Sequence, residues 1–209
     1  MGNKKKGNKV VYELVKLLMD LGISLCLLIL TSPILILLAV LVRSTTPGSA
    51  FFKQIRVGTH GKLFTLYKFR TMYKDADKMK DRLSHLNEKE GPIFKIRRDP
   101  RVTPLGRFLR QTSLDELPQL FNILKGDMSL VGPRPHLPEE IKKYTKRQLK
   151  RLSVKPGITS LWAISGRSHL SFRRWMAMDI RYIEKRSLSF DIYILLKTIP
   201  TVITGSGAW

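Results

Sequence analysis

The chain has 209 residues and a formal net charge of +22 at pH 7, with 38 lysines and arginines against 16 aspartates and glutamates. This excess implies an acidic partner: nucleic acid, anionic lipid headgroups or a phosphorylated substrate. Cys26 is the only cysteine, which excludes an intrachain disulfide framework and a cysteine-based zinc site.

The segment from Leu21 to Val42 contains no charged residue and has Ser32-Pro33 near its middle. As a helix it would measure about 33 Å, enough to cross a hydrocarbon core of about 30 Å. Pro33 cannot donate to the carbonyl of Ile29, so the helix kinks unless the hydroxyls of Thr31 or Ser32 satisfy the freed groups. A kinked spanning helix and a re-entrant helix both fit this pattern. Basic residues on both flanks favour the re-entrant form, and no signal-peptidase-like site follows the run.

The rest of the chain suffices for one modest domain. We therefore expect two units, residues 1–43 with a basic leader and the membrane helix, and residues 44–209 as a single domain. Expected in chain order are two strands around a Gly-containing turn in 50–72, an exposed helix or ordered loop in 75–90, a helix from about Pro104, and a helix in 113–126 closed by Gly126. A Pro-rich loop in 129–140, a basic helix in 138–152, a turn at 155–157, a helix in 172–185 and an apolar core or interfacial helix in 189–203 complete the chain. The helix in 113–126 is expected to bury Leu114, Leu117, Phe121 and Leu124.

The adjacent acids Asp115 and Glu116 are notable in a chain with so few acidic residues. The pattern Ser113-x-x-Glu116 matches a helix capping box, which is the structural interpretation of these residues. A functional role is compatible with it, because an acid in a first helical turn stays ionised and the same place attracts phosphate or a divalent cation. Such a carboxylate can act as a nucleophile toward phosphorus or as a Mg²⁺ ligand.

Several arginines are candidates for phosphate contacts, since a guanidinium fork matches phosphate oxygens geometrically. Arg110 belongs to an arginine-rich stretch, Arg134 is fixed between two prolines, and Arg167 follows a glycine. Solvated surface charge is the alternative for each of them. The histidines lack zinc-site spacing, and the P-loop, dinucleotide-binding and G-x-S-x-G patterns are absent from the sequence.

These residues resemble a known family. The motifs that carry the resemblance are the apolar run with Ser-Pro, YKFRTM (67–72), TSLDELPQLFNILKGDMSLVGPRP (112–135), VKPGIT (154–159) and SGR (165–167). Together they strongly resemble the bacterial sugar transferases, the monotopic phosphoglycosyl transferases that initiate glycan assembly on polyprenyl phosphate. The resemblance extends over nearly the whole chain, and the DELPQL…GPRP block is highly specific.

The resemblance implies an α+β, predominantly helical fold with a re-entrant membrane helix broken at Ser32-Pro33. It further implies a compact catalytic domain, residues 44–209, on the cytosolic face, with interfacial amphipathic helices. The expected location is the cytoplasmic face of the bacterial inner membrane, in contact with anionic lipids. A homodimer is one possible assembly.

The implied reaction transfers a sugar 1-phosphate from a UDP-sugar to undecaprenyl phosphate and releases UMP, with Mg²⁺ as cofactor. By resemblance, Asp115 attacks the β-phosphorus and also ligates Mg²⁺, while Glu116 supports the chemistry. Lys68, Arg110 and Arg167 are the implied phosphate and substrate contacts, and Arg134 lies in a loop that resembles a nucleotide-binding element. The family often has Asn where this chain has Ser165.

The alternative is a membrane-tethered basic protein that binds nucleic acid or acts as a scaffold, explained by the net charge of +22. It predicts binding that weakens steeply with salt and survives loss of Asp115. If the enzyme assignment holds, no nucleic acid is expected as a partner. The sequence identifies neither the sugar nor the glycan pathway.

Overall fold

The computed structural model describes the backbone of residues 2–208 and the side chains of residues 10–208. The α-helices are α1 (Gly2–Thr45), α2 (Pro104–Gln111), α3 (Gln119–Leu124), α4 (Pro138–Ile141), α5 (Lys146–Leu149), α6 (Leu161–Ile164), α7 (Phe172–Lys185) and α8 (Leu188–Thr204). The strands are β1 (Phe51–Val57), β2 (Leu63–Phe69), β3 (Ser129–Val131) and β4 (Gly157–Thr159). Short 3₁₀ turns are η1 (Thr59–Gly61), η2 (Ala76–Met79), η3 (Ser84–Leu86), η4 (Leu114–Glu116), η5 (Lys150–Ser153) and η6 (Arg167–His169). Helices predominate, as the sequence predicts.

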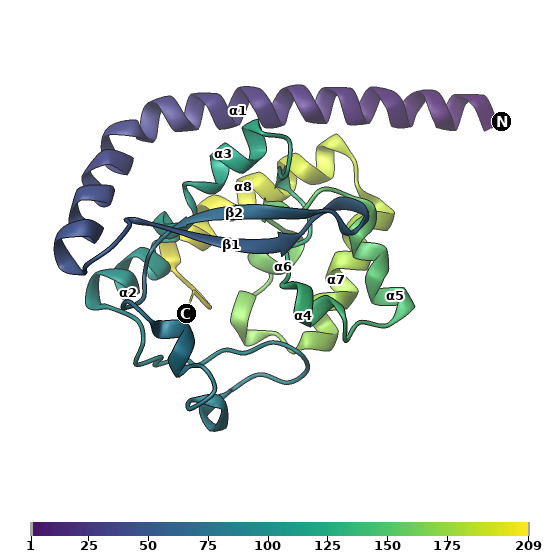
Figure 1. Ribbon diagram of the computed structural model, residues 1–209. Helices are drawn as coiled ribbons and strands as arrows, with labels where there is room; N and C mark the ends of the chain where they lie inside the picture. The colour runs from purple at the N-terminus through teal and green to yellow at the C-terminus, as the bar shows by residue number, and fades with distance from the viewer. Residues whose placement is uncertain (1, 209) are drawn as a thin grey trace.

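Helix α1 changes direction near its middle, so that its first part runs straight along the domain and its second part turns down toward β1 (Figure 1). Pro33 lies inside the helix. The hydroxyl of Ser32 donates to the carbonyl of Ile29 over 2.8 Å, and that of Thr31 donates to the carbonyl of Leu27 over 2.6 Å. A neighbouring hydroxyl therefore satisfies the carbonyl that Pro33 leaves free, and the helix changes direction nonetheless.

Both parts of α1 pack on the domain, although most of the apolar surface of the helix is exposed. Leu28, before the bend, joins the main hydrophobic core, and Leu38 and Val42, after the bend, join a second core with Phe69 and Leu109. Exposed apolar side chains of α1 include Ile29, Leu30, Ile36, Leu37 and Val40. From Val10 to Thr45 the helix is long and apolar enough to cross a membrane, and an exposed apolar surface of this kind marks a contact with lipid or protein.

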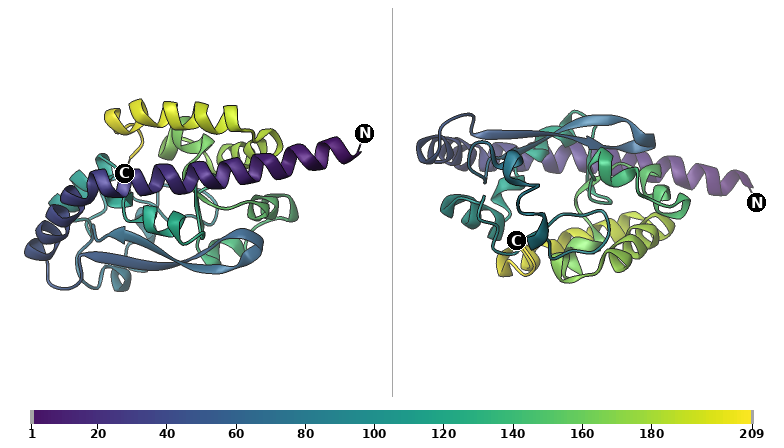
Figure 2. Two further views of the ribbon diagram at one scale, coloured as in Figure 1. Left: turned by 90° about the horizontal axis from the view of Figure 1, so that it is seen from above. Right: turned by 60° about the horizontal axis from the view of Figure 1, so that its bottom comes forward.

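A buried polar cluster ties the first part of α1 to the end of the chain. Asp191 of α8 is fully buried and forms an ion pair with Lys16 over 3.0 Å. The Tyr12 hydroxyl donates to the same carboxylate over 2.9 Å, and the Tyr182 hydroxyl lies 2.8 Å from its other oxygen. Seen from above, α8 lies along one flank of α1 and the β1–β2 hairpin along the other (Figure 2). Helix α1 is thus anchored to the domain near its start as well as at its end.

The four strands form two separate pairs. Strands β1 and β2 are antiparallel, and their turn places His60 and Gly61 in the left-handed region, which confirms the predicted hairpin with a Gly-containing turn. Strands β3 and β4 pair in parallel, with Ser129 opposite Gly157. The backbone N–H of Leu130 in β3 also donates to Asp20 of α1 over 3.1 Å. The sequence instead predicts a Pro-rich loop at β3, and a turn followed by an irregular stretch at β4.

Two predicted helices differ from the structure. The basic helix expected over 138–152 is divided into α4, α5 and η5, because Tyr144 is drawn into a buried aromatic cluster and Thr145 caps a new helix. Within 113–126, a 3₁₀ turn precedes the short helix α3, which ends before Gly126 as predicted. The buried face of α3 is formed by Leu120 and Ile123, whereas Phe121, which we expected to be buried, is exposed.

Four further predicted elements lie where they were expected, whereas the stretch 157–168, expected to be irregular, contains α6 and η6. Helix α2 begins at Pro104 behind a Thr103 cap, and α7 has the predicted bounds. Residues 75–90 form an exposed ordered loop with two 3₁₀ turns, one of the two predicted forms. Helix α8 buries Asp191 and Ile194 and exposes an apolar side, formed by Ile192, Tyr193, Leu196, Ile199 and Ile203. Such a helix suits a membrane interface better than a core.

Candidate active site

The acidic pair Asp115-Glu116 lies in η4, where the backbone departs from helical capping. Ser113 has φ 57° and ψ 15°, and its side chain does not cap the following turn. The predicted capping box is therefore wrong. Ser113 instead accepts a hydrogen bond from the Arg167 guanidinium over 3.3 Å, and Arg167 itself has a positive φ of 49°. A non-glycine residue in this region costs about 1–3 kcal/mol, and such strain is concentrated at functional sites.

Glu116 is held by two cations from distant parts of the chain. The Lys68 ammonium, on β2, donates to its carboxylate over 2.8 Å, and the Arg134 guanidinium, between β3 and α4, donates to the same oxygen over 2.9 Å. Although burial opposes ionisation, Arg134 and Lys68 hold the pKa of Glu116 far below its ordinary value. Glu116 is thus an ionised anchor for both cations at neutral pH.

Asp115 has a different environment, although it is the next residue. Its side chain is only 10% exposed, and its Oδ2 lies 3.8 Å from the Lys68 ammonium, beyond hydrogen-bond distance. Burial raises the pKa of Asp115 above its ordinary value, Lys68 opposes this shift, and the neighbouring charge of Glu116 adds to it. Within residues 10–208 its carboxylate accepts no hydrogen bond. Asp115 is therefore the carboxylate of the pair that is left for a ligand.

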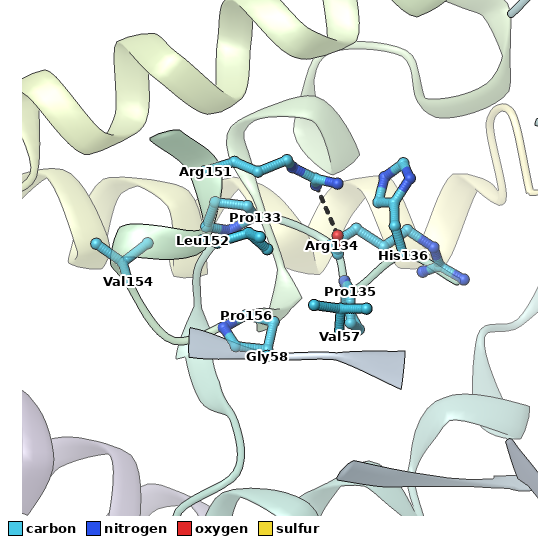
Figure 3. Close-up of a pocket in the computed structure, with 10 residues that line it drawn as sticks. All are labelled: Val57, Gly58, Pro133, Arg134, Pro135, His136, Arg151, Leu152, Val154 and Pro156. Carbon is cyan, nitrogen blue, oxygen red and sulfur yellow. Dashed lines mark hydrogen bonds between the residues drawn. The ribbon is translucent and has the colours of Figure 1, made fainter. Parts of the chain in front are cut away.

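The loop that carries Arg134 is fixed along its backbone. The carbonyl of Pro133 accepts from the N–H of Gly157 over 3.0 Å, that of Arg134 from the Arg151 guanidinium over 2.6 Å, and that of Pro135 from the Arg56 guanidinium over 3.1 Å. Figure 3 shows the contact from Arg151. Gly157 lets the backbones approach, since a Cβ there would lie 2.1 Å from the N of Gly132.

The pocket beneath this loop is a packing feature (Figure 3). It encloses about 10 Å³, the lower limit for a single water molecule, which is too little for any substrate. Behind it, Arg151 forms an ion pair with Asp179 over 2.7 Å, and both side chains are 2% exposed. Burial raises the pKa of Asp179 to about 6 despite this partner. The pair therefore supports the Arg134 loop from inside the domain.

The structure brings all six predicted site residues to one region. Lys68 and Arg134 both contact Glu116, and Arg167 contacts the side chain of Ser113, two residues before Asp115. Arg110 donates to the hydroxyl of Thr71 over 3.0 Å. Its charge favours the ionised form of Asp115, while burial lowers the pKa of Arg110 itself. Four cations thus surround two carboxylates, an arrangement suited to binding phosphate oxygens.

Sequence reasoning missed the residues that support this region. Arg56 and Arg151 lie in basic stretches where solvated charge is the default interpretation, and no local signal distinguishes them. Lys95 was also missed: its ammonium contacts the Ser168 hydroxyl. Burial and the charges of Arg134 and Arg110 lower the pKa of Lys95 to about 7. It therefore adds a cation whose charge depends on pH in the neutral range.

The described residues contain no group of three or more histidine, cysteine, aspartate and glutamate side chains that could hold a metal. Since Glu116 is engaged by two cations, Asp115 is the one carboxylate available at the site. Mg²⁺ is commonly bound by one or two carboxylates together with substrate phosphates and water. The residues thus fit a Mg²⁺ that arrives with a phosphorylated substrate, and they do not form a separate metal site.

Comparison with known proteins bears on this arrangement. The family model of the bacterial sugar transferases matches residues 11–205. The chain belongs to this family. Among bacterial sugar transferase relatives, galactosyl transferase CpsE of Streptococcus agalactiae is 49% identical over 162 residues, which is 77% of this chain. Undecaprenyl-phosphate galactose phosphotransferase of Salmonella typhimurium is 43% identical over 199 residues, or 91% of this chain.

A third relative resembles the chain over more of its own length. UDP-glucose:undecaprenyl-phosphate glucose-1-phosphate transferase of Caulobacter vibrioides is 37% identical over 210 aligned residues, covering 96% of this chain and 74% of that protein. The alignments span 36% of CpsE and 40% of the Salmonella protein. The chain thus corresponds to the part that these bacterial sugar transferases share.

Proposed function

We propose that this bacterial sugar transferase moves a sugar 1-phosphate from a UDP-sugar to undecaprenyl phosphate and releases UMP. The observation that carries the proposal is the difference between the environments of the two acidic residues. Glu116 holds Lys68 and Arg134, while Asp115 is buried beside these cations without a hydrogen bond within residues 10–208. The names of the Salmonella and Caulobacter relatives support undecaprenyl phosphate as the acceptor.

The proposed reaction has two displacements at one phosphorus. A carboxylate oxygen of Asp115 attacks the β-phosphorus of the donor, the bond from that phosphorus to the bridging oxygen breaks, and UMP leaves with the oxygen. A phosphate oxygen of undecaprenyl phosphate then attacks the same phosphorus, and the bond to Asp115 breaks. The product is a diphosphate-linked lipid sugar, and the carboxylate is restored. Such a route predicts ping-pong kinetics.

The chain's own cations have defined roles in this scheme. Lys68 and Arg134 remain close to Asp115 because Glu116 holds them, and they offset the negative charge of two phosphate groups brought together. Arg110 and Arg167 are placed to contact phosphate oxygens. Mg²⁺, held by Asp115 and the donor diphosphate, would supply further charge neutralisation.

The activity is testable with the full chain in detergent or nanodiscs. We expect UMP to be released from at least one member of a panel of UDP-sugars when undecaprenyl phosphate and Mg²⁺ are present. Removal of the metal with EDTA should reduce the rate at least tenfold, and added Mg²⁺ should restore it, because charge on the transferring group is then neutralised again. UMP release that is unaffected by EDTA would reject the role of Mg²⁺, and no release from any donor would reject the activity.

We further propose that α1 is a re-entrant membrane helix, so that the enzyme lies on the cytoplasmic face of the bacterial inner membrane. Its first part is bound to the domain by the ion pair of Lys16 with Asp191, and its last turns pack through Leu38 and Val42. In a straight spanning helix, one end of α1 would lie away from the domain and its contacts with the domain would be lost. The change of direction near the middle of α1, the presence of Pro33 in the helix and the exposed apolar residues around Pro33 support a helix that dips into lipid and returns.

Single-cysteine labelling distinguishes the two topologies. In a Cys26→Ser background, we expect Lys5→Cys in the leader and Lys74→Cys in the exposed loop to be protected from a membrane-impermeant thiol reagent added to intact spheroplasts. Both should react after the membrane is opened. Labelling of Lys5→Cys alone in intact spheroplasts would show that the leader is outside, and it would restore the spanning helix.

A further inference from the structure

A large cleft lies beside the acidic pair and is distinct from the small pocket under the Arg134 loop. It has a volume of about 860 Å³ and lies between the loop before α2, α2 itself and the C-terminal residues 205–208. We call it the arginine cleft, because Arg97, Arg98, Arg107 and Arg110 line it. A volume of this order is typical of sites for small organic ligands.

The charge of the arginine cleft is largely uncompensated. Within residues 10–208, the side chains of Arg97, Arg98 and Arg107 form no hydrogen bond or ion pair. Two carboxylates also line the cleft, but Asp99 is paired with Arg101 over 2.6 Å, and Glu88 accepts from the backbone N–H of Arg97 over 2.7 Å. The guanidinium groups of Arg97, Arg98 and Arg107 thus line the cleft without a partner among residues 10–208, which points to an anionic ligand.

The cleft reaches the acidic pair at one end. Arg110 lines it and also favours ionisation of Asp115. On the opposite wall, the C-terminal tail packs closely against the turn that carries Arg167, since a Cβ at Gly207 would lie 2.6 Å from the carbonyl of Gly166. A phosphate bound at the Arg110 end would thus lie next to Asp115, with the rest of its molecule extending along the cleft.

The lining of the cleft favours a water-soluble ligand over a lipid. In Figure 1 the C-terminal tail lies below α1 and the β1–β2 hairpin. The exposed apolar surfaces suited to lipid lie on α1 and α8, whereas the walls of the cleft carry four arginines and two acidic residues. Apolar side chains from Ile96, Val102 and Ala208 supply a surface for a flat ring alongside the guanidinium groups.

We propose that the arginine cleft binds the nucleoside diphosphate part of the donor, with the diphosphate toward Arg110 and the base toward Arg97 and Arg98. This inference rests on the proposed function and assigns that activity a donor site. Arg134, which we expected in a nucleotide-binding loop, does not line the cleft. In this assignment Arg134 serves the transferring phosphate and the arginine cleft holds the leaving nucleotide.

The test compares a variant that lacks two positive charges of the cleft with a control variant that lacks two positive charges outside it. The variant Arg97→Ala/Arg98→Ala is compared with Lys142→Ala/Lys143→Ala, which removes exposed lysines that lie outside the cleft. Binding of UDP to the full chain in nanodiscs is measured by calorimetry. We expect the cleft variant to bind UDP about tenfold or more weakly, since each charge-assisted contact contributes roughly that factor, and the lysine variant to bind it as the wild type does.

Steady-state kinetics provide the second measurement. In the cleft variant KM for the UDP-sugar should rise about tenfold or more, while KM for undecaprenyl phosphate stays unchanged. Unchanged UDP affinity, or a rise in KM confined to undecaprenyl phosphate, would overturn the assignment, the latter by making the cleft the lipid-phosphate site. If the wild type binds UDP but releases no UMP, the proposed activity fails, and the binding comparison still decides the cleft. Unchanged thermal unfolding of the variant confirms that it folds.

Discussion

Replacing Asp115 with asparagine should lower the rate of UMP release by about 10⁴-fold or more, the size of loss seen when an enzyme loses its nucleophile. The amide is almost isosteric and cannot form the phosphosugar ester. Intact-protein mass spectrometry of the wild type, incubated with a UDP-sugar and Mg²⁺ but no acceptor, should show an added phosphosugar that Asp115→Asn lacks. The exposed Asp81→Asn is the matched control and should retain both activity and adduct.

The same variant should fold at least as stably as the wild type. Because burial raises the pKa of Asp115, the folded chain binds this proton more tightly than the unfolded chain does. The unfolding free energy of the wild type therefore falls as pH rises from the ordinary carboxylate pKa through the raised pKa of Asp115. Asparagine does not titrate, so the variant lacks this pH-dependent loss of stability. Denaturant unfolding at low and neutral pH measures the difference. Full activity of Asp115→Asn would refute the covalent route, and failure to fold would indicate a structural role for the carboxylate.

Truncating Arg151 should have the largest effect on stability. Arg151→Ala leaves the carboxylate of Asp179 buried without its partner, a change that costs about 3–5 kcal/mol of unfolding free energy. It also removes the donor to the carbonyl of Arg134, so the Arg134 loop loses one of its three backbone ties. Chemical denaturation measures the first effect, and the turnover rate of the folded fraction measures the second. Arg147→Ala, an exposed arginine on α5, should change neither.

A double variant separates the stability of this pair from its positioning role. Arg151→Met/Asp179→Leu removes both charges, and replacing a buried ion pair by apolar groups is often neutral or stabilising. We expect much of the lost stability to return while turnover stays low, because methionine cannot donate to the Arg134 carbonyl. If turnover recovers together with stability, Arg151 has only a structural role.

The elements that sequence predicted well depend on local signals. The hairpin, the start of α2 at Pro104 and the bounds of α7 follow from alternation, helix capping and periodicity within a few residues. The hydrogen bond from the Ser32 hydroxyl to the carbonyl of Ile29 is equally local, because it requires only the geometry of one helical turn. The motif resemblance located the six candidate residues, and the structure brings them together.

The failures have a non-local cause. The capping box at Ser113 is a sound local pattern, but Glu116 binds Lys68 and Arg134, which are 48 and 18 residues away. These contacts turn its side chain away from the helix start, and Ser113 adopts a left-handed conformation that no local preference predicts. Likewise, β3 and β4 are short strands whose pairing depends on a partner distant in sequence. The sequence around Arg151 and Arg97 looks like that of ordinary solvent-exposed arginines, so neither role could be predicted from it.

The packing of α1 limits the ways in which this protein can be purified. Leu28, Leu38 and Val42 belong to the cores that also contain Leu120 and Phe69, so the helix completes the interior of the domain. Deleting the helix to obtain a water-soluble fragment would leave cavities in two hydrophobic cores and destabilise the domain. The helix proposed to enter lipid is therefore also an internal part of the domain, and purification strategies should replace the lipid around α1 rather than remove the helix.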